Sequence, residues 1–250
     1  MRSQNLETRA INTLRFLSAD GVQKANSGHP GLPMGAAAMA YTIWTRHLRH
    51  NPRNPKWMGR DRFILSGGHG SMLLYSLLHL TGYNLSLDEL NNFRQWGSLT
   101  PGHPEYGLTP GVEVTTGPLG QGLSFGNGIA LALKMDKKSN RVYVLLGDGE
   151  LQEGQIWEAA MTATQYKLDN VMAIVDSNKL QQTNFVRAIK PVEPIGAKFA
   201  AFGWNVINVA DGHNFDQLRD AIRRGWKTKF KPTVLVCETV KGKGVPFAEH

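Results

Sequence analysis

The stretch VYVLLGDGELQEGQIWEA, residues 142–159, joins an apolar run to an acidic, helix-like segment through a Gly-Asp-Gly turn. The run VYVLL has the length and β-branched content of a buried strand, and residues 153–166 carry apolar side chains three and four positions apart, as an amphipathic helix does. Gly147 and Gly149 would let the backbone on either side of Asp148 approach a ligand closely. This order predicts an α/β unit whose ligand lies at the carboxyl end of the strand.

The same alternation of strand-like and helix-like segments runs through most of the chain. It predicts an α/β fold with a mostly parallel sheet and helices on both faces. The strand-like runs are RFILS (62–66), VEVTT (112–116), VYVLL (142–146), VMAIVD (171–176), WNVINVA (204–210) and TVLVCETV (233–240). The helix-like runs are residues 7–25, 70–80, 121–135, 153–166 and 214–226. In the last of these, Asn214 and Gln217 have the spacing of a capping box.

Length and composition favour a single domain over residues 1–250, because 41% hydrophobic content over this length can bury a substantial core. The stretch 97–128 is rich in Gly, Pro and Thr but includes VEVTT, so we interpret it as functional loops within that domain. MGAAAMAYTIW (34–44) is too short to cross a bilayer and the N-terminus is polar, so a soluble, cytoplasmic protein without a membrane partner is expected. The single cysteine, Cys237, excludes an internal disulfide.

The chain is basic, with 28 basic against 20 acidic residues and a formal net charge of +8. This excess suits nucleic acid, an anionic surface or phosphorylated small molecules, and charge alone does not choose among them. Basic residues concentrate at 46–62 and 223–231, which match no nucleic-acid-binding motif, so a solvated basic face is the simpler interpretation and no nucleic-acid partner is expected. The segment KGKG (241–244) could reach an anion or form a solvated loop.

A second polar position follows the next strand-like run. Asn178 comes 178 − 148 = 30 positions after Asp148, about the length of a strand, a helix and a strand. Two neighbouring parallel strands would then bring a carboxylate and an amide oxygen to the same sheet edge, where they could bind Mg²⁺ beside a diphosphate. The alternatives are a helix cap for Asp148 and a turn role for Asn178.

Three histidines occupy turns that contain Gly or Pro, where neither a helix face nor a strand face explains them. They are His29, His69 and His103, and we regard them as candidate site residues. No such role is predicted for His47, His50, His79 and His213. His79, within LLYSLLHL, is expected in the core.

The Gly-Asp-Gly turn followed by Asn178 resembles the diphosphate-binding motif of thiamine diphosphate (ThDP) enzymes. ANSGHPGLPMG, ILSGGHGSMLLYSLLHLTGY, TPGHPE and TTGPLGQG resemble transketolase, and the resemblance covers essentially the whole chain. It implies the ThDP-binding fold, with Mg²⁺ held by the side chains of Asp148 and Asn178 and by the backbone carbonyl of Leu180. It places Gly149 at the diphosphate and His69 at both diphosphate and substrate.

The resemblance also implies roles for residues around the reacting centre. His29 and His103 would contact the donor's hydroxyls and assist proton transfer. Gly117 would lie near the aminopyrimidine ring and Leu119 beside the thiazolium ring. Glu153 would belong to a buried acidic network that links two cofactor sites across a dimer.

The whole chain resembles only one part of a single-chain transketolase, the diphosphate-binding region. Pyrimidine-binding and C-terminal domains like those of single-chain transketolases are absent from these residues. DGELQEGQIWEAAMTATQYKLDN (148–170) is more similar to split transketolases, although Lys179 stands where many ThDP enzymes have a second asparagine. The implied protein is the N-terminal subunit of a split transketolase, inactive alone. It would be completed by a C-terminal transketolase subunit, as a heterotetramer of two pairs acting on sugar phosphates. His250 is assigned no role.

The implied reaction moves a two-carbon ketol unit from a ketose phosphate to an aldose phosphate. A related ketol transferase with a dihydroxyacetone-forming or branched-sugar-phosphate donor, and a fragment of a longer enzyme, are close alternatives. A noncatalytic ThDP-fold binding module and a basic nucleic-acid-binding protein rank below them.

Overall fold

The computed structural model describes residues 2–182 and 184–249; His250 lies outside them. Its centre is a five-stranded sheet in the order β1-β2-β3-β7-β6, with every neighbouring pair parallel. The strands are β1 (Arg62–Leu65), β2 (Val142–Gly147), β3 (Val171–Ser177), β6 (Asn205–Val209) and β7 (Thr233–Glu238). This arrangement confirms the predicted mostly parallel sheet.

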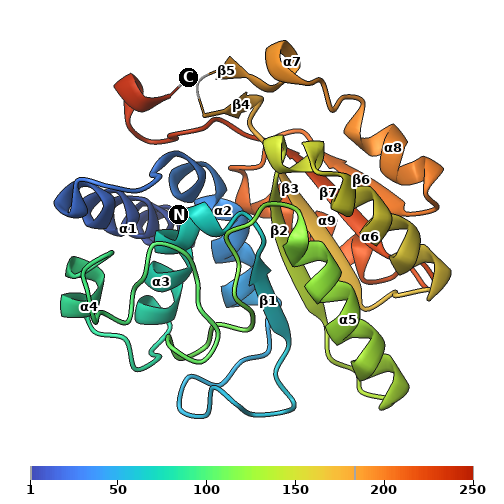
Figure 1. Cartoon of the computed structure of the whole chain (residues 1–250), viewed down its shortest axis with the longest axis horizontal. Coiled ribbons are helices and arrows are strands. Elements are labelled where there is room, and N and C mark those ends of the chain that lie inside the picture. The colour runs from blue at the N-terminus through green and yellow to red at the C-terminus, as the bar shows by residue number, and fades with distance from the viewer. Residues whose placement is uncertain (1, 183, 250) are drawn as a thin grey trace.

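Helices cover both faces of the sheet, as predicted (Figure 1). The side chains of β2 and β3 are buried at every position, which is typical of parallel strands covered on both sides. Alternate residues along each strand enter two apolar clusters, with Tyr143 and Leu145 in one and Val142 and Val144 in the other. The first cluster includes residues of α1 (Arg2–Ala25), α2 (Gly31–Arg46), α3 (Ser71–Leu80), α4 (Leu87–Asn91) and α9 (Phe215–Gly225). The second includes residues of α5 (Gln121–Met135), α6 (Gly154–Gln165) and α8 (Ile195–Ala201).

Helix α2 was not predicted from the sequence, although its residues include the apolar run at 34–44. Its side chains from Leu32 to Trp44 are all buried. A helix enclosed on all sides lacks the polar face that gives an amphipathic helix its recognisable period. The short elements were also missed: α4, α7 (Val186–Ile189), the hairpin of β4 (Leu180–Gln181) with β5 (Asn184–Phe185), and the single turns η1 (Gly68–Gly70), η2 (Gly149–Gln152) and η3 (Pro246–Ala248).

The predicted strand at 112–116 is wrong, because these residues form a loop. Their alternating pattern has another cause. Val112 is buried, whereas Glu113 forms a two-pronged ion pair with Arg60, both N–O distances being 2.7 Å. Side-chain packing and charge pairing therefore produce the pattern without a backbone ladder.

Only one of the two hydrogen bonds of the predicted capping box at α9 is present. The side chain of Asn214 accepts a hydrogen bond from the backbone N–H of Gln217 at 3.1 Å, but the Gln217 side chain accepts from Asp211 instead of Asn214. In the part of the chain that the structure describes, no helix is long and apolar enough to cross a membrane.

Candidate active site

The carboxyl ends of β1, β2, β3 and β7 open on one edge of the sheet, and most of the predicted site residues follow these ends. Asp148 comes directly after β2 and is only 2% exposed. Its Oδ1 accepts from the backbone N–H of Gly149 at 2.8 Å, and its Oδ2 accepts from that of Lys179 at 2.5 Å. The first bond makes Asp148 the cap of η2, so the helix-cap alternative holds as local geometry. It does not exclude a cation, because a carboxylate has further lone pairs.

Burial raises the pKa of Asp148 to about 7, against the opposing effect of the two backbone hydrogen bonds. The charged form is disfavoured because little solvent reaches it. A nearby divalent cation would stabilise the charged carboxylate and offset the cost of its burial. The burial of Asp148 therefore suits a metal ligand.

Asn178 lies on the adjacent strand end, as the spacing predicted. In the register of β2 with β3, Gly147 lies opposite Asp176, so the polar residues that follow both strands share one edge. The side chain of Asn178 donates to Asp176 at 2.9 Å and accepts from the backbone N–H of Leu180 at 3.0 Å. The convergence of Asp148 and Asn178 is therefore confirmed, and their binding of Mg²⁺ stays a prediction.

Within residues 2–182 and 184–249, no group of three or more His, Cys, Asp or Glu side chains is arranged to hold a metal ion. The predicted ligand set is of a different kind. It consists of one carboxylate, one amide oxygen and the backbone carbonyl of Leu180, which are hard oxygen donors of the sort that Mg²⁺ prefers.

The three candidate histidines come together beside this edge. His69 lies in η1 after β1, and His29 lies just before α2, with their ring centroids 5.3 Å apart in an edge-to-face arrangement. Burial is the main cause that lowers the pKa of all three, that of His69 to about 4, and nearby positive charge contributes to the lowering at each histidine. All three imidazoles are therefore neutral near pH 7, and each can donate one hydrogen bond to a ligand and accept another.

The glycine loop predicted to hold the cofactor rings packs between the histidine turns. A Cβ atom added to Gly68 would lie 2.7 Å from the backbone nitrogen of Gly117, and one added to Gly117 would lie 3.3 Å from the ring of His103. Gly120 directly precedes α5 as its N-cap, with φ +85°, a left-handed conformation that glycine adopts without strain. Leu119, between Gly117 and Gly120, is 38% exposed, which leaves its side chain accessible to a ligand or a second chain.

Glu150 is a buried residue of the site region that the sequence did not indicate. It is 3% exposed, and its Oε1 accepts from the Ser66 hydroxyl at 2.5 Å and from Gly120 N–H at 2.8 Å, while Oε2 accepts from Gly147 N–H at 3.2 Å. One carboxylate thus ties together the ends of β1 and β2 and the start of α5. Its position in a polar GELQEG segment gave no signal of burial, because only tertiary packing brings its three donors together.

The structure leaves the predicted roles of two site residues, Glu153 and Gly149, untested. Glu153 is exposed in this chain, so the predicted buried acidic network would need a second chain to cover it. Gly149 lies beside Asp148, but its N–H already bonds to that carboxylate, and a Cβ added to it would lie 3.0 Å from Cβ of Gln181. Its predicted contact with a diphosphate stays a prediction.

Two of the histidines without a predicted site role, His79 and His213, make hydrogen bonds that support the structure. His79 is half-buried, and its Nδ1 lies 2.8 Å from the backbone oxygen of Leu85, so it lies at the edge of the core and not within it. Nε2 of His213 accepts from the backbone N–H of Val240 at 2.9 Å and supports the loop after β7.

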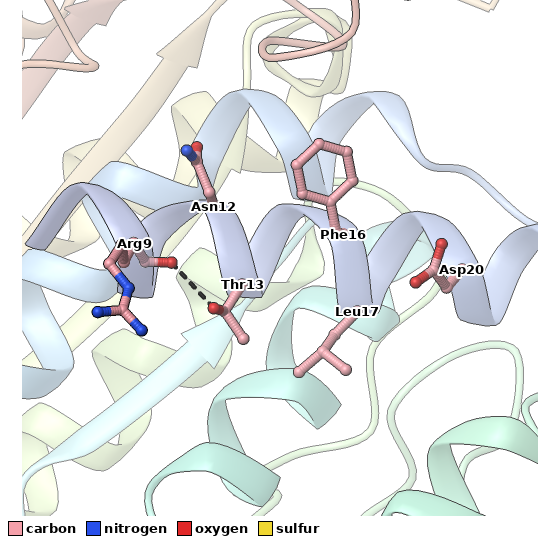
Figure 2. A pocket seen from close by; sticks show the side chains of 6 residues that line it. All are labelled: Arg9, Asn12, Thr13, Phe16, Leu17 and Asp20. Atoms are coloured by element: carbon pink, nitrogen blue, oxygen red, sulfur yellow. Dashed lines mark hydrogen bonds between the residues drawn. The ribbon is translucent and has the colours of Figure 1, made fainter. Parts of the chain in front are cut away.

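Two hollows of the surface were compared with the predicted site residues. One of about 420 Å³ is lined by Asp148 and Lys179 on the sheet side and by residues 185–187 and 191–193 around the β4–β5 hairpin. Another, of about 390 Å³, runs along α1 and is lined by Arg9, Asn12, Thr13, Phe16, Leu17 and Asp20 (Figure 2). Only the first includes a predicted site residue.

Comparisons with known proteins give a consistent family. The model of the family described as "Transketolase, thiamine diphosphate binding domain" matches residues 6–250. A transketolase of Halalkalibacterium halodurans is 50% identical over 98% of this chain, and one of Geobacillus stearothermophilus is 47% identical over 98%. The chain spans 38% of the length of each of these two relatives.

Solved structures agree with these sequence matches. The transketolase of Campylobacter jejuni superposes with a TM-score of 0.94 at 45% identity, covering 98% of this chain and 39% of the solved chain. The Pichia stipitis transketolase in complex with sedoheptulose 7-phosphate superposes with a TM-score of 0.93 at 41% identity, covering 97% of this chain and 37% of that one.

Proposed function

The chain belongs to the transketolase family, in its thiamine diphosphate-binding domain, and from this premise we propose that it is the cofactor-binding part of a ketol transferase. The reaction would move a two-carbon ketol unit from a ketose phosphate to an aldose phosphate. The observation that carries the proposal is the placement of Asp148 and Asn178 at neighbouring strand ends, beside a cluster of three neutral histidines.

The residues of the edge fit a magnesium diphosphate group. Asp148, Asn178 and the carbonyl of Leu180 would hold Mg²⁺, since they supply oxygen donors and the buried carboxylate lacks a bonded cationic side chain among the described residues. Gly117 and Leu119 would face the rings of the cofactor, where a backbone without a side chain and an exposed apolar side chain suit flat rings. When bound, ThDP supplies the nucleophilic carbon and the electron sink that carbon–carbon cleavage of a ketose requires.

The histidines would position the sugar and move its protons. His29 and His103 remain neutral at pH 7, so a ring nitrogen of each can accept the proton of a donor hydroxyl and return it as the bond order changes. His69, whose pKa is about 4, is the weaker base and serves better as a fixed hydrogen-bonding partner for phosphate or substrate oxygens.

We further propose that a C-terminal transketolase subunit supplies the pyrimidine-binding half, and that two such pairs form a heterotetramer. Leu119 and Glu153 support this proposal, because both are exposed in the chain while their proposed roles need a covering surface. The substrates would be sugar phosphates, with which the excess of basic residues is compatible.

The test begins with isolation of the tagged chain from its native extract and identification of a stoichiometric partner. The assembled complex is then assayed for ketol transfer between sugar phosphates with ThDP and Mg²⁺. We expect transfer by the wild type, its loss in Asp148→Ala, and its retention in the control Asp136→Ala, since Asp136 is exposed at the end of α5. Full activity of Asp148→Ala would contradict the metal assignment, and a complex that binds ThDP without transfer would favour a noncatalytic module.

A further inference from the structure

The loop proposed to face the cofactor rings, residues 116–120, is anchored at its two ends, and we call it the ring loop. At one end, the backbone N–H of Thr116 donates to the carbonyl of Pro104 at 3.1 Å. At the other end, the backbone N–H of Gly120 donates to Oε1 of Glu150 at 2.8 Å. In the part of the chain that the structure describes, the residues between these ends donate no backbone hydrogen bond. The position of the ring loop therefore depends on the Glu150 carboxylate.

The Glu150 carboxylate is itself held in place. It is 3% exposed, and it also accepts from the Ser66 hydroxyl directly after β1 and from the backbone N–H of Gly147 at the end of β2. The carbonyl of Glu150 accepts from the N–H of Glu153 at 3.1 Å, which fixes the backbone that carries the side chain. The ends of β1 and β2 therefore set the position of the oxygen that meets the ring loop.

Glu150 supplies a bond that the start of α5 cannot make for itself. In a capping box, a Glu or Gln three residues after the N-cap accepts from the backbone N–H of the N-cap residue. Here the N-cap is Gly120, and the residue at that position is the buried, apolar Leu123. Glu150 makes the bond instead, from a separate segment of the chain. Close packing allows it, since a Cβ added to Gly120 would lie 2.7 Å from Cβ of Glu153.

The strand ends proposed for the metal have hydrogen bonds of their own. The backbone N–H of Asp148 donates to the carbonyl of Asp176 at 3.1 Å. The Asp148 carboxylate accepts from the N–H groups of Gly149 and Lys179. None of these bonds involves Glu150. Loss of the Glu150 carboxylate would therefore release the ring loop and leave the bonds around the metal ligands in place.

We propose that Glu150 is a positioning residue, which holds the ring loop in the conformation that binds the rings of the cofactor. The inference rests on the proposed function. Glu150 acts through the N–H of Gly120, and so on Gly117 and Leu119 within the same short loop. A loop already in its bound conformation loses less conformational entropy when the ligand binds, which raises the affinity. The role needs an oxygen atom within reach of Gly120, and it does not need a negative charge.

The test uses the chain assembled with its partner and measures the dissociation constant for ThDP with Mg²⁺ by calorimetry. We expect Glu150→Ala to weaken binding on the order of 10- to 100-fold, because the released loop is in its binding conformation only part of the time. Glu150→Gln keeps an oxygen on a side chain of the same length and should restore most of the affinity. Glu150→Asp keeps the charge but is one methylene group shorter, so it should bind ThDP almost as weakly as Glu150→Ala.

Asn127→Ala is the matched control, because Asn127 is a buried polar residue of the same helix, about two turns beyond Gly120. Its side chain donates to the carbonyl of Ala159 on α6 at 2.8 Å. Loss of this bond should destabilise the fold and leave the ThDP affinity unchanged. Hydrogen exchange of the unliganded protein gives a second measurement. A peptide that covers the ring loop should exchange faster than in the wild type in Glu150→Ala, and at the wild-type rate in Asn127→Ala.

The outcomes separate this inference from the function on which it rests. If the wild type does not bind ThDP, the proposed function fails and the inference fails with it. If the wild type binds ThDP and Glu150→Ala binds it equally well, only the inference is overturned. Equal losses of affinity in Glu150→Ala and Asn127→Ala would show that Glu150 acts only through the stability of the fold. Should Glu150→Ala fail to fold, the other two Glu150 variants carry the test. Tighter binding by Glu150→Asp than by Glu150→Gln would show that the charge matters and not the reach, and either result would overturn the proposal.

Discussion

Alanine in place of Gly68 should destabilise the protein and disturb the cofactor site, because this position is where two site loops meet. The added Cβ would lie 2.7 Å from both the nitrogen of Gly117 and the carbonyl carbon of Thr116. Non-bonded carbon atoms prefer a separation of roughly 3.5–4.0 Å, so the overlap is about 1 Å. Backbone atoms cannot rotate out of the way as a flexible side chain does. The loop that carries Gly117 must therefore move away from the turn that carries His69.

Overpacking of this kind costs about 1–3 kcal/mol of the free energy of unfolding. We would measure it by urea denaturation without cofactor, comparing midpoints at constant slope. The same variant should bind ThDP more weakly in the assembled protein, because the displaced backbone lines the proposed site for the cofactor rings.

Gly128→Ala is the matched control, since Gly128 is an exposed position of α5 with no atom within 4 Å of the added Cβ. Alanine there should stabilise the protein by about 0.5–1 kcal/mol, because it is the better helix former. Opposite signs for the two variants support the packing geometry of the site. A Gly68→Ala protein that unfolds at the wild-type urea concentration and binds ThDP normally would refute it.

Three further predictions concern ionisable groups that are buried or half-buried. Glu150→Ala should lower the free energy of unfolding by about 3 kcal/mol or more in urea denaturation, because the Ser66 hydroxyl and two backbone N–H groups lose their acceptor; a loss under about 1 kcal/mol would contradict the network. Asp148 has its pKa raised from 3.8 to about 7, so without metal its contribution to stability is lost as pH rises through that range, by at most about 4 kcal/mol. Asp148→Asn should flatten this fall in a series of pH-dependent denaturations and remove the stabilisation by Mg²⁺; an unchanged profile would argue against the burial. His69 has its pKa lowered from 6.5 to about 4, so its contribution is present above pH 6.5 and lost as pH falls toward 4, by up to about 3 kcal/mol. His69→Gln should reduce the acid loss measured between pH 7 and 4.5, and an equal loss in the variant would place the imidazole in solvent.

The sequence predicted the parts of the fold that local pattern determines. Five of the six predicted strands are present, because their apolar runs are bounded by turns and separated by amphipathic helices. Helix α2 was missed because it is apolar on every side, and VEVTT was misassigned because Val112 packs and Glu113 pairs with arginine outside any sheet. In both cases tertiary contacts, and not the period of the residues, decide the structure.

The sequence likewise predicted only part of the candidate site. The convergence of Asp148 and Asn178 was predictable, since each follows a strand and neighbouring parallel strands end at one edge. The role of Glu150 was not, because it depends on hydrogen-bond donors from three separate segments. Its local sequence does not differ from that of an ordinary charged surface.

The central claim is that the edge formed by β2 and β3 binds thiamine diphosphate through Mg²⁺. The most direct measurement is calorimetric titration of ThDP into the assembled protein, with Mg²⁺ and with the metal removed by a chelator, for the wild type and for Asn178→Ala. We predict that the wild type binds ThDP only with Mg²⁺, and that Asn178→Ala, which lacks the amide oxygen, binds it much more weakly. Equal binding without the metal, or equal binding by Asn178→Ala, would contradict the account.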